Sequence, residues 1–154
     1  MDVTAELTAP CAPDVLFRYV ADLGSYPEWL DIVPRAVPDD GDEPAWVVDL
    51  RGRLGPFARS KRLRMVRTTE QAPTKVVFER RERDGRSHAP WILQVVVERV
   101  DGDNDSDGAA PGDSRLTMHL HYGGAFWGPV LERILGDEIE NSKPRLLALL
   151  ESTP

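Results

Sequence analysis

Two polar residues interrupt an apolar stripe near the end of the chain, and both could take part in chemistry. Between residues 128 and 153, leucine and isoleucine recur at the three- and four-residue spacing of one helical face. Ser142 projects near the centre of this stripe and Glu138 near its edge. Either Glu138 extends to the rim and Ser142 hydrogen-bonds to a helical carbonyl, or both face a cavity and meet a ligand.

If there is catalysis, acid–base chemistry inside such a cavity is what the residue types allow. Glu138 is the best candidate, because a carboxyl group against an apolar wall can exchange a proton near neutral pH. Arg80, Tyr122 and Ser142 could polarise a carbonyl group of a bound molecule. Each of these four residues also has a purely structural interpretation, so the catalytic residues stay unknown at this point.

Two patterns resemble metal sites without completing them. Residues 103–108 place acids at the first, third and fifth positions of a calcium loop and glycine at the sixth. The twelfth position is Ser114, where a bidentate glutamate is needed, so we interpret the segment as a solvated hairpin loop. His119 and His121 point the same way on a predicted strand, but outward and without a clear third ligand. The sequence therefore predicts no metal site.

Cofactor motifs and nucleophile motifs are also missing. The sequence has no glycine-rich phosphate loop, no nucleophile elbow and no paired cysteines. Its one cysteine, Cys11, cannot form an internal disulfide, and no neighbouring base is evident that would activate it. We therefore expect no cofactor.

Composition is that of a globular protein with an uneven charge distribution. The 154 residues suit one domain, and the net charge of −7 argues against DNA binding. Residues 51–86, however, hold twelve Lys and Arg against four Asp and Glu. Such a run is either a solvated sheet face or a contact for anionic lipid, an acyl carrier protein or ribosomal RNA. RNA is the weakest of these, because Phe78 is the only interleaved aromatic residue.

The N-terminal segment lacks the basic and apolar regions of a signal peptide, and no run of eighteen apolar residues occurs. We therefore expect no transmembrane segment and a cytoplasmic location.

Apolar–polar alternation predicts strands at residues 3–9, 45–53, 58–69, 75–83, 91–100 and 115–122. A short helix is expected at residues 14–21 and a second helix or turn at 22–30, with Ser25 as its N-cap, Pro27 in its first turn and the Asp22 carboxylate available to cap it. Residues 34–44 are expected to form a loop. The last helix, residues 128–153, is the only one long enough to cover a sheet. This order predicts an α+β fold: a curved antiparallel sheet of six to seven strands around one long C-terminal helix. Such a sheet seldom fills its interior, so a pocket is expected.

Three segments near the N-terminus carry a family resemblance: APCAPDVLF at 9–17, VADL at 20–23 and YPEWL at 26–30. They resemble the START-like (SRPBCC) superfamily with the helix-grip, or START/Bet v 1-like, fold. The nearest branch is the polyketide cyclase/dehydrase and lipid-transport group, and coenzyme Q-binding proteins and ribosome-associated toxins share the same opening. The element order extends the resemblance over essentially the whole chain. It implies a hydrophobic cavity between the sheet and the last helix.

The resemblance, combined with strand parity, implies a set of ligand-binding residues. Tyr26 and Trp29 could close one mouth of the cavity, or simply plug the fold. The strand walls would be Trp46, Val48, Leu63, Met65, Phe78, Trp91, Leu93, Val95, Met118, Leu120 and Tyr122, and the helix wall Leu131, Leu135, Glu138 and Ser142. A β-bulge would reverse this assignment for the residues beyond it.

Three functions are compatible with the sequence. The leading hypothesis is binding of a hydrophobic small molecule, such as a lipid, an isoprenoid or a polyketide-like compound. The second is an enzyme of the polyketide cyclase, aromatase or dehydratase kind, accelerating its reaction mainly by positioning. The third is an interaction module that uses the basic face, with an acyl carrier or another protein as partner. The ligand, and whether the chain is a monomer or a homodimer, stay open.

Overall fold

The computed structural model describes residues 2–39, 41–54, 57–100, 112–123 and 128–152. Its elements are β1 (Asp2–Ala9), α1 (Pro13–Val20), the 3-10 helix η1 (Leu23–Glu28), β2 (Arg35–Pro38), β3 (Ala45–Leu54), β4 (Phe57–Gln71), β5 (Lys75–Arg80), β6 (Trp91–Arg99), β7 (Ser114–Tyr122) and α2 (Gly128–Glu151). The calcium-like segment at 103–108 and the side chain of the predicted wall residue Leu131 lie outside this description.

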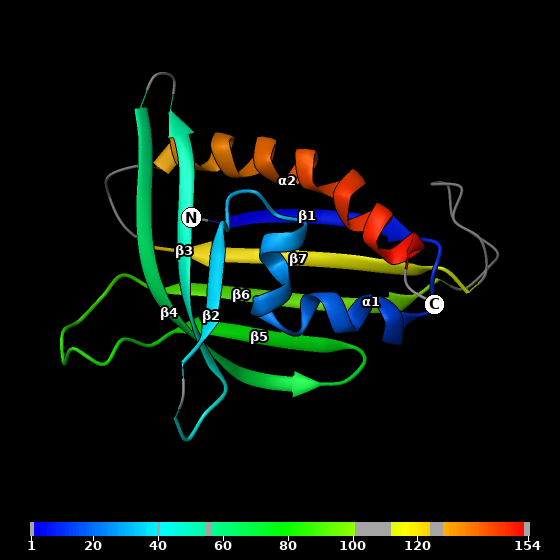
Figure 1. Cartoon of the computed structure of the whole chain (residues 1–154), viewed down its shortest axis with the longest axis horizontal. Helices are drawn as coiled ribbons and strands as arrows, with labels where there is room; N and C mark the ends of the chain where they lie inside the picture. Colours follow the sequence, from blue (N-terminus) through cyan, green and yellow to red (C-terminus); the bar gives the residue numbers. More distant parts are fainter. Residues whose placement is uncertain (1, 40, 55–56, 101–111, 124–127, 153–154) are drawn as a thin grey trace.

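The seven strands form one antiparallel sheet in the order β1-β7-β6-β5-β4-β3-β2 (Figure 1). Consecutive strands from β2 to β7 pair as neighbours. β1 pairs with β7 and forms one edge of the sheet, and β2 forms the other. The sheet bends along β4, its longest strand, whose register with β5 shifts between Arg67 and Thr69. The predicted α+β fold, a curved sheet with a long C-terminal helix, is confirmed.

Two parts of the sheet differ from the prediction by more than two residues. The segment predicted as a loop contains β2, a four-residue edge strand too short to show alternation. The strand predicted at 75–83 ends at Arg80. After it, the Arg81 amide donates to the Arg64 carbonyl and the Glu82 carboxylate accepts from the Arg64 amide, so a side chain takes over the pairing with β4.

The prediction for the start of η1 is half right. The Asp22 carboxylate accepts a hydrogen bond from the Gly24 amide at 2.8 Å, as a cap does. The prediction of Ser25 as N-cap is wrong, because its hydroxyl donates to the carbonyls of Tyr19 and Asp22 instead. Asp22 already occupies the cap position.

One face of the sheet, the inner face, carries the core. Tyr26 and Trp29 from η1 are buried against it with ring centroids 4.8 Å apart, and Tyr26 stands edge-on to Phe78. The Tyr26 hydroxyl donates to the Val20 carbonyl at 2.8 Å, and burial raises the pKa of the Tyr26 phenol. These rings fill the end of the curved sheet covered by α1 and η1.

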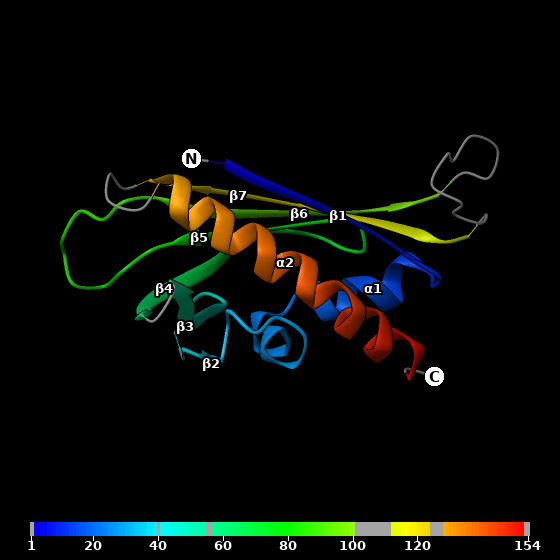
Figure 2. The ribbon, with the colours of Figure 1, turned by 90° about the horizontal axis from the view of Figure 1, so that it is seen from above.

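Helix α2 lies along the β1 edge of the sheet and reaches toward β3 at its other flank (Figures 1 and 2). Its buried positions are Leu135, Ser142, Leu146 and Leu150, and its exposed positions include Arg133, Asp137 and Glu140. A Cβ placed at Gly52 of β3 would lie 3.3 Å from Cγ2 of Ile134, so a glycine permits this close approach. The predicted amphipathic helix is confirmed.

Candidate functional site

The centre of the inner face is a row of apolar residues that the fold leaves incompletely covered. Leu93 of β6, Leu120 of β7 and Val3 of β1 stand directly opposite one another in register. All three point inward, yet all three are only half-buried. We call these three residues the central row. Part of the surface of each of these apolar residues therefore stays accessible.

The neighbouring rows are more deeply buried at their β6 residues. Val95 is fully buried, whereas its partner Met118 is half-buried like the central row. On the other side, the buried rings of Trp91 and Tyr122 stack with centroids 5.2 Å apart. Burial raises the pKa of the Tyr122 phenol, with a further contribution from the negative charge of Glu132. The central row is therefore bounded by buried residues, Val95 on one side and Trp91 and Tyr122 on the other.

The second half of α2 closes tightly on the sheet. A void of about 20 Å³ lies between β1, β7 and α2, bordered by Trp29, Met118 and Ser142 among others. That volume holds about one water molecule. The Ser142 hydroxyl donates to the Ile139 carbonyl at 2.7 Å, which is the structural alternative considered for this residue. Glu138 is half-buried one turn before it.

The remaining predicted wall residues lie on the inner face, as strand parity predicted. Trp46, Val48, Leu63 and Met65 are buried in β3 and β4. Trp46 meets Phe78 edge-on at 5.7 Å and lies under the guanidinium of Arg67 at 5.4 Å. The register shift lies beyond these β4 residues, so parity holds for them. Their contact with a ligand stays a prediction.

A polar group borders the packed Trp91–Tyr122 row. Continuing the pairing of Glu79 with Ile92 by one residue sets Arg80 opposite Trp91. Arg80 Nε lies 3.1 Å from Glu82 Oε1, and its side chain is 10% exposed. The Lys61 ammonium lies 5.8 Å from the Trp91 ring centroid. We call Lys61, Arg80 and Trp91 the donor cluster.

Lys61 was missed by the sequence reasoning, although a signal for it exists. It alternates in phase with Leu63 and Met65 on β4, so it belongs to the inner face rather than to the outer arginines. Burial, followed by repulsion from Arg80, lowers the pKa of Lys61. The signal in the sequence is a lysine at a position that alternates in step with the apolar residues Leu63 and Met65.

Two buried indole N–H groups have no hydrogen-bond partner within the described chain: Nε1 of Trp29 and Nε1 of Trp91. An unpaired buried donor costs free energy, so a water molecule or a ligand atom at either position stabilises the protein. Trp29 borders the small void, and Trp91 belongs to the donor cluster.

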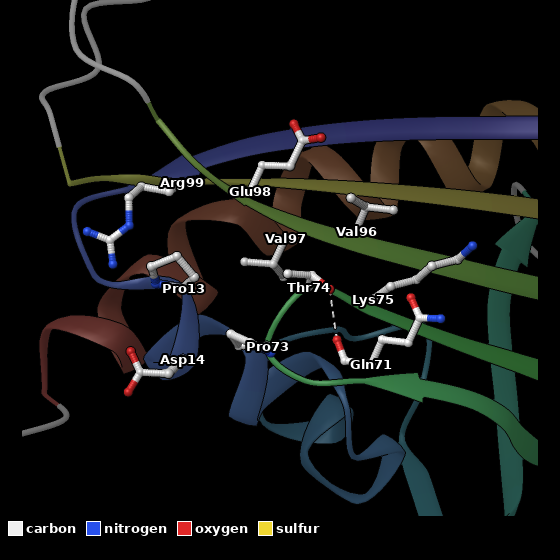
Figure 3. Close-up of a pocket in the computed structure, with 10 residues that line it drawn as sticks. All are labelled: Pro13, Asp14, Gln71, Pro73, Thr74, Lys75, Val96, Val97, Glu98 and Arg99. Carbon is white, nitrogen blue, oxygen red and sulfur yellow. Dashed lines mark hydrogen bonds between the residues drawn. The ribbon is translucent and has the colours of Figure 1, made fainter.

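A wider hollow of about 750 Å³ lies at the other end of β6, where the β4–β5 turn approaches the start of α1 (Figure 3). Its rim carries two acids, Asp14 and Glu98, and two bases, Lys75 and Arg99. Most of its lining residues are exposed. This surface is open and of mixed charge, so it selects neither an apolar ligand nor one sign of charge.

The two histidines on β7 contact Asp2 on the edge strand β1. Asp2 Oδ1 lies 2.8 Å from His119 Nε2 and 3.0 Å from His121 Nδ1, and these contacts lower the pKa of Asp2. Among the described residues, no group of three or more His, Cys, Asp and Glu is placed to hold a metal ion. The Cys11 thiol is half-buried, and burial raises its pKa, which disfavours the reactive thiolate.

The curved sheet, the two short helices after β1 and the long final helix define a START-like helix-grip fold. The chain belongs to the family described as polyketide cyclase/dehydrase and lipid transport, whose family model matches residues 1–151.

Solved structures with this fold come from several bacteria. A START superfamily protein from Mycobacterium smegmatis matches with a TM-score of 0.68 at 13% identity, covering 97% of each chain. A protein from Thermus thermophilus matches with a TM-score of 0.66 at 15% identity, covering 99% of this chain and 100% of that one. The AHSA1 protein from Silicibacter pomeroyi matches with a TM-score of 0.62 at 18% identity, covering 98% of each. At these identities the likeness establishes the fold alone.

None of the curated proteins matches the chain. No helix in its described part has the length and apolar content needed to cross a membrane.

Proposed function

We propose that the protein binds a hydrophobic small molecule between the inner face and α2. The observation that carries the proposal is the central row, because three inward-facing apolar residues in register are only half-buried. Covering apolar surface is favourable by roughly 25 cal/mol per Å². Family membership supports the same kind of ligand, a lipid, an isoprenoid or a polyketide-like compound.

The enzyme alternative has less support from the described residues. Ser142 already donates its hydroxyl proton to Ile139, and Tyr122 is buried against Trp91. Glu138 stays the one predicted acid–base group on the α2 wall, and binding does not require it.

The interaction-module alternative loses support because the basic run is extensively paired. Arg62 pairs with Asp49, Arg67 with Glu70, and Arg80 with Glu82. Arg64 is buried rather than solvated, which corrects the expectation of a uniformly solvated face.

The proposal is tested by filling the space. We expect Leu120→Trp to keep the free energy of unfolding within about 1 kcal/mol of wild type and to abolish binding of the apolar dye Nile red. The matched control is Val95→Trp, one row along and fully buried, where overpacking costs about 1–3 kcal/mol or more. Urea unfolding and dye fluorescence measure the two effects.

Two results contradict the proposal. One is equal destabilisation by Leu120→Trp and Val95→Trp, which means that the interior beside Leu120 is solid. The other is a wild-type protein that does not bind the dye.

A further inference from the structure

We propose that the ligand is an amphiphile with an anionic head group, and that the donor cluster holds this head while the apolar chain lies along the central row. This inference rests on the proposed function and adds to it the chemical class of the ligand and its orientation.

The first argument is position. Arg80 and Trp91 extend the Trp91–Tyr122 row, which lies two residues along the strands from the central row. Lys61 projects from the same inner face and reaches Trp91. The donor cluster and the central row are therefore neighbouring parts of one surface.

The second argument is access. β2 pairs only with the first half of β3, as far as Asp49. Beyond that point a hollow of about 480 Å³ opens. Its lining includes Lys61 and the Asp49–Arg62 ion pair, in which the acid is already neutralised. The Lys61 side chain is exposed there, so an ionic group can reach it without crossing the core.

The third argument is the balance of donors and acceptors. Glu82 Oε1 is the acceptor for Arg80 Nε, and it also accepts the Arg64 amide. Arg80 Nη1 donates to the uncharged Ala89 carbonyl at 3.5 Å. Within the described chain no carboxylate lies within 4 Å of the Lys61 ammonium, and Trp91 Nε1 has no partner. Partial desolvation of its exposed side chain, followed by the charge of Arg80, lowers the pKa of Lys61, and Glu82 acts in the opposite direction. An added negative charge would stabilise this cation. Two cations and an unpaired N–H group against one shared acid favour an anion.

The fourth argument is length. The central row lies about 7 Å along the strands from the Trp91 row, at 3.3 Å per residue, and spans about 10 Å from β6 to β1, at 4.8 Å per strand. Beyond this, the small void beside Met118 and Ser142 leaves no further room. A medium-length chain attached to the head group is therefore the suitable probe.

The experiment compares decanoate, decyl phosphate and decan-1-ol, which share one apolar chain, by titration calorimetry on the full chain. We expect wild type to bind at least one of the two anions about tenfold more tightly than the alcohol, and the tighter anion identifies the head group. We expect Lys61→Gln to weaken binding of that anion about tenfold and to leave the alcohol unchanged.

The matched control is Lys75→Gln. It removes the same charge from β5, at the rim of the wide hollow near α1 and outside both the donor cluster and its access hollow. We expect it to leave all three affinities within twofold of wild type.

Each other outcome overturns a defined claim. Equal affinity for the alcohol and both anions, or equal losses from Lys61→Gln and Lys75→Gln, overturns the head-group inference and leaves the proposed function standing. If wild type binds none of the three compounds and does not bind Nile red, the proposed function fails together with the inference. If wild type binds Nile red but none of the three decyl compounds, the inference alone is overturned.

Discussion

Asp39 shows how one buried partner sets the ionisation of a carboxyl group near the surface. Arg64 Nε donates to Asp39 Oδ2 at 2.6 Å. This hydrogen bond, aided by the charges of Arg83 and Arg64, holds the pKa of Asp39 below its ordinary value of 3.8. The folded protein therefore favours the ionised form of Asp39.

The lowered pKa of Asp39 makes the free energy of unfolding depend on pH. A carboxyl group with a lowered folded pKa stabilises the protein fully above its unfolded pKa, and this contribution is lost as the pH falls through the folded pKa. We expect Asp39→Asn to destabilise the protein at pH 7, and the difference from wild type to shrink below about pH 3.8. Urea unfolding at pH 7, 5, 3 and 2 measures it.

The control for that series is Asp14→Asn, which removes an exposed carboxylate 3.8 Å from Arg18. We expect its effect to be small at every pH. A difference for Asp39→Asn that stays constant from pH 7 to pH 2 would show that the Arg64 contact does not stabilise the ionised form.

Single residues of the candidate site were predictable only where alternation or helical spacing fixed their side. Leu93 and Leu120 followed from strand parity, and Ser142 from the position of α2's stripe. The hydrogen bond that occupies Ser142 depends on a rotamer, and the role of Lys61 depends on Trp91 lying two strands away in the sheet order. The spacing of residues along the sequence predicts neither the Ser142 hydrogen bond nor the contact of Lys61 with Trp91.

At the scale of elements, Arg64 connects three parts of the chain. Its guanidinium contacts Asp39 and Glu43, which lie between β2 and β3, and it donates to the Arg81 carbonyl after β5. Its side chain is 7% exposed. Arg62, two residues earlier, pairs with Asp49 on β3 and is 70% exposed.

This contrast yields a paired prediction. We expect Arg64→Gln to lower the free energy of unfolding by about 2 kcal/mol, because it leaves buried or half-buried partners unpaired. We expect Arg62→Gln to lower it by less than about 1 kcal/mol, as is usual for exposed ion pairs. Urea unfolding at neutral pH compares them, and equal effects would mean that Arg64 does not connect these segments.

Most elements of this fold follow from the sequence, because each of the longer strands and the final helix shows its own period. β2 did not, since four residues at a sheet edge carry no pattern, and the end of β5 did not, since Glu82 takes over the pairing by a side chain. The capping of η1 by Asp22 was available as an alternative to Ser25, but local sequence does not rank two cap candidates three residues apart.

At the scale of the whole molecule, the central claim concerns space that no single element defines. α2 approaches the sheet at β1 and β3, while the central row crosses the strands β6, β7 and β1. How much of that row stays exposed depends on the bend of the sheet and on the angle of α2 together (Figure 2). Sequence patterns assign residues to the inner face, but they do not tell how far apart the opposite walls lie.

The most direct test is an isotope-filtered NOE measurement on methyl-labelled protein with unlabelled decan-1-ol, a ligand whose binding does not depend on the head-group inference. We predict contacts from the alcohol chain to methyl groups of Leu93, Leu120 and Val3, and none to Val96, which lines the wide hollow near α1. Contacts to Val96 without contacts to the central row would contradict the account, because they would place the apolar ligand outside the space between the inner face and α2.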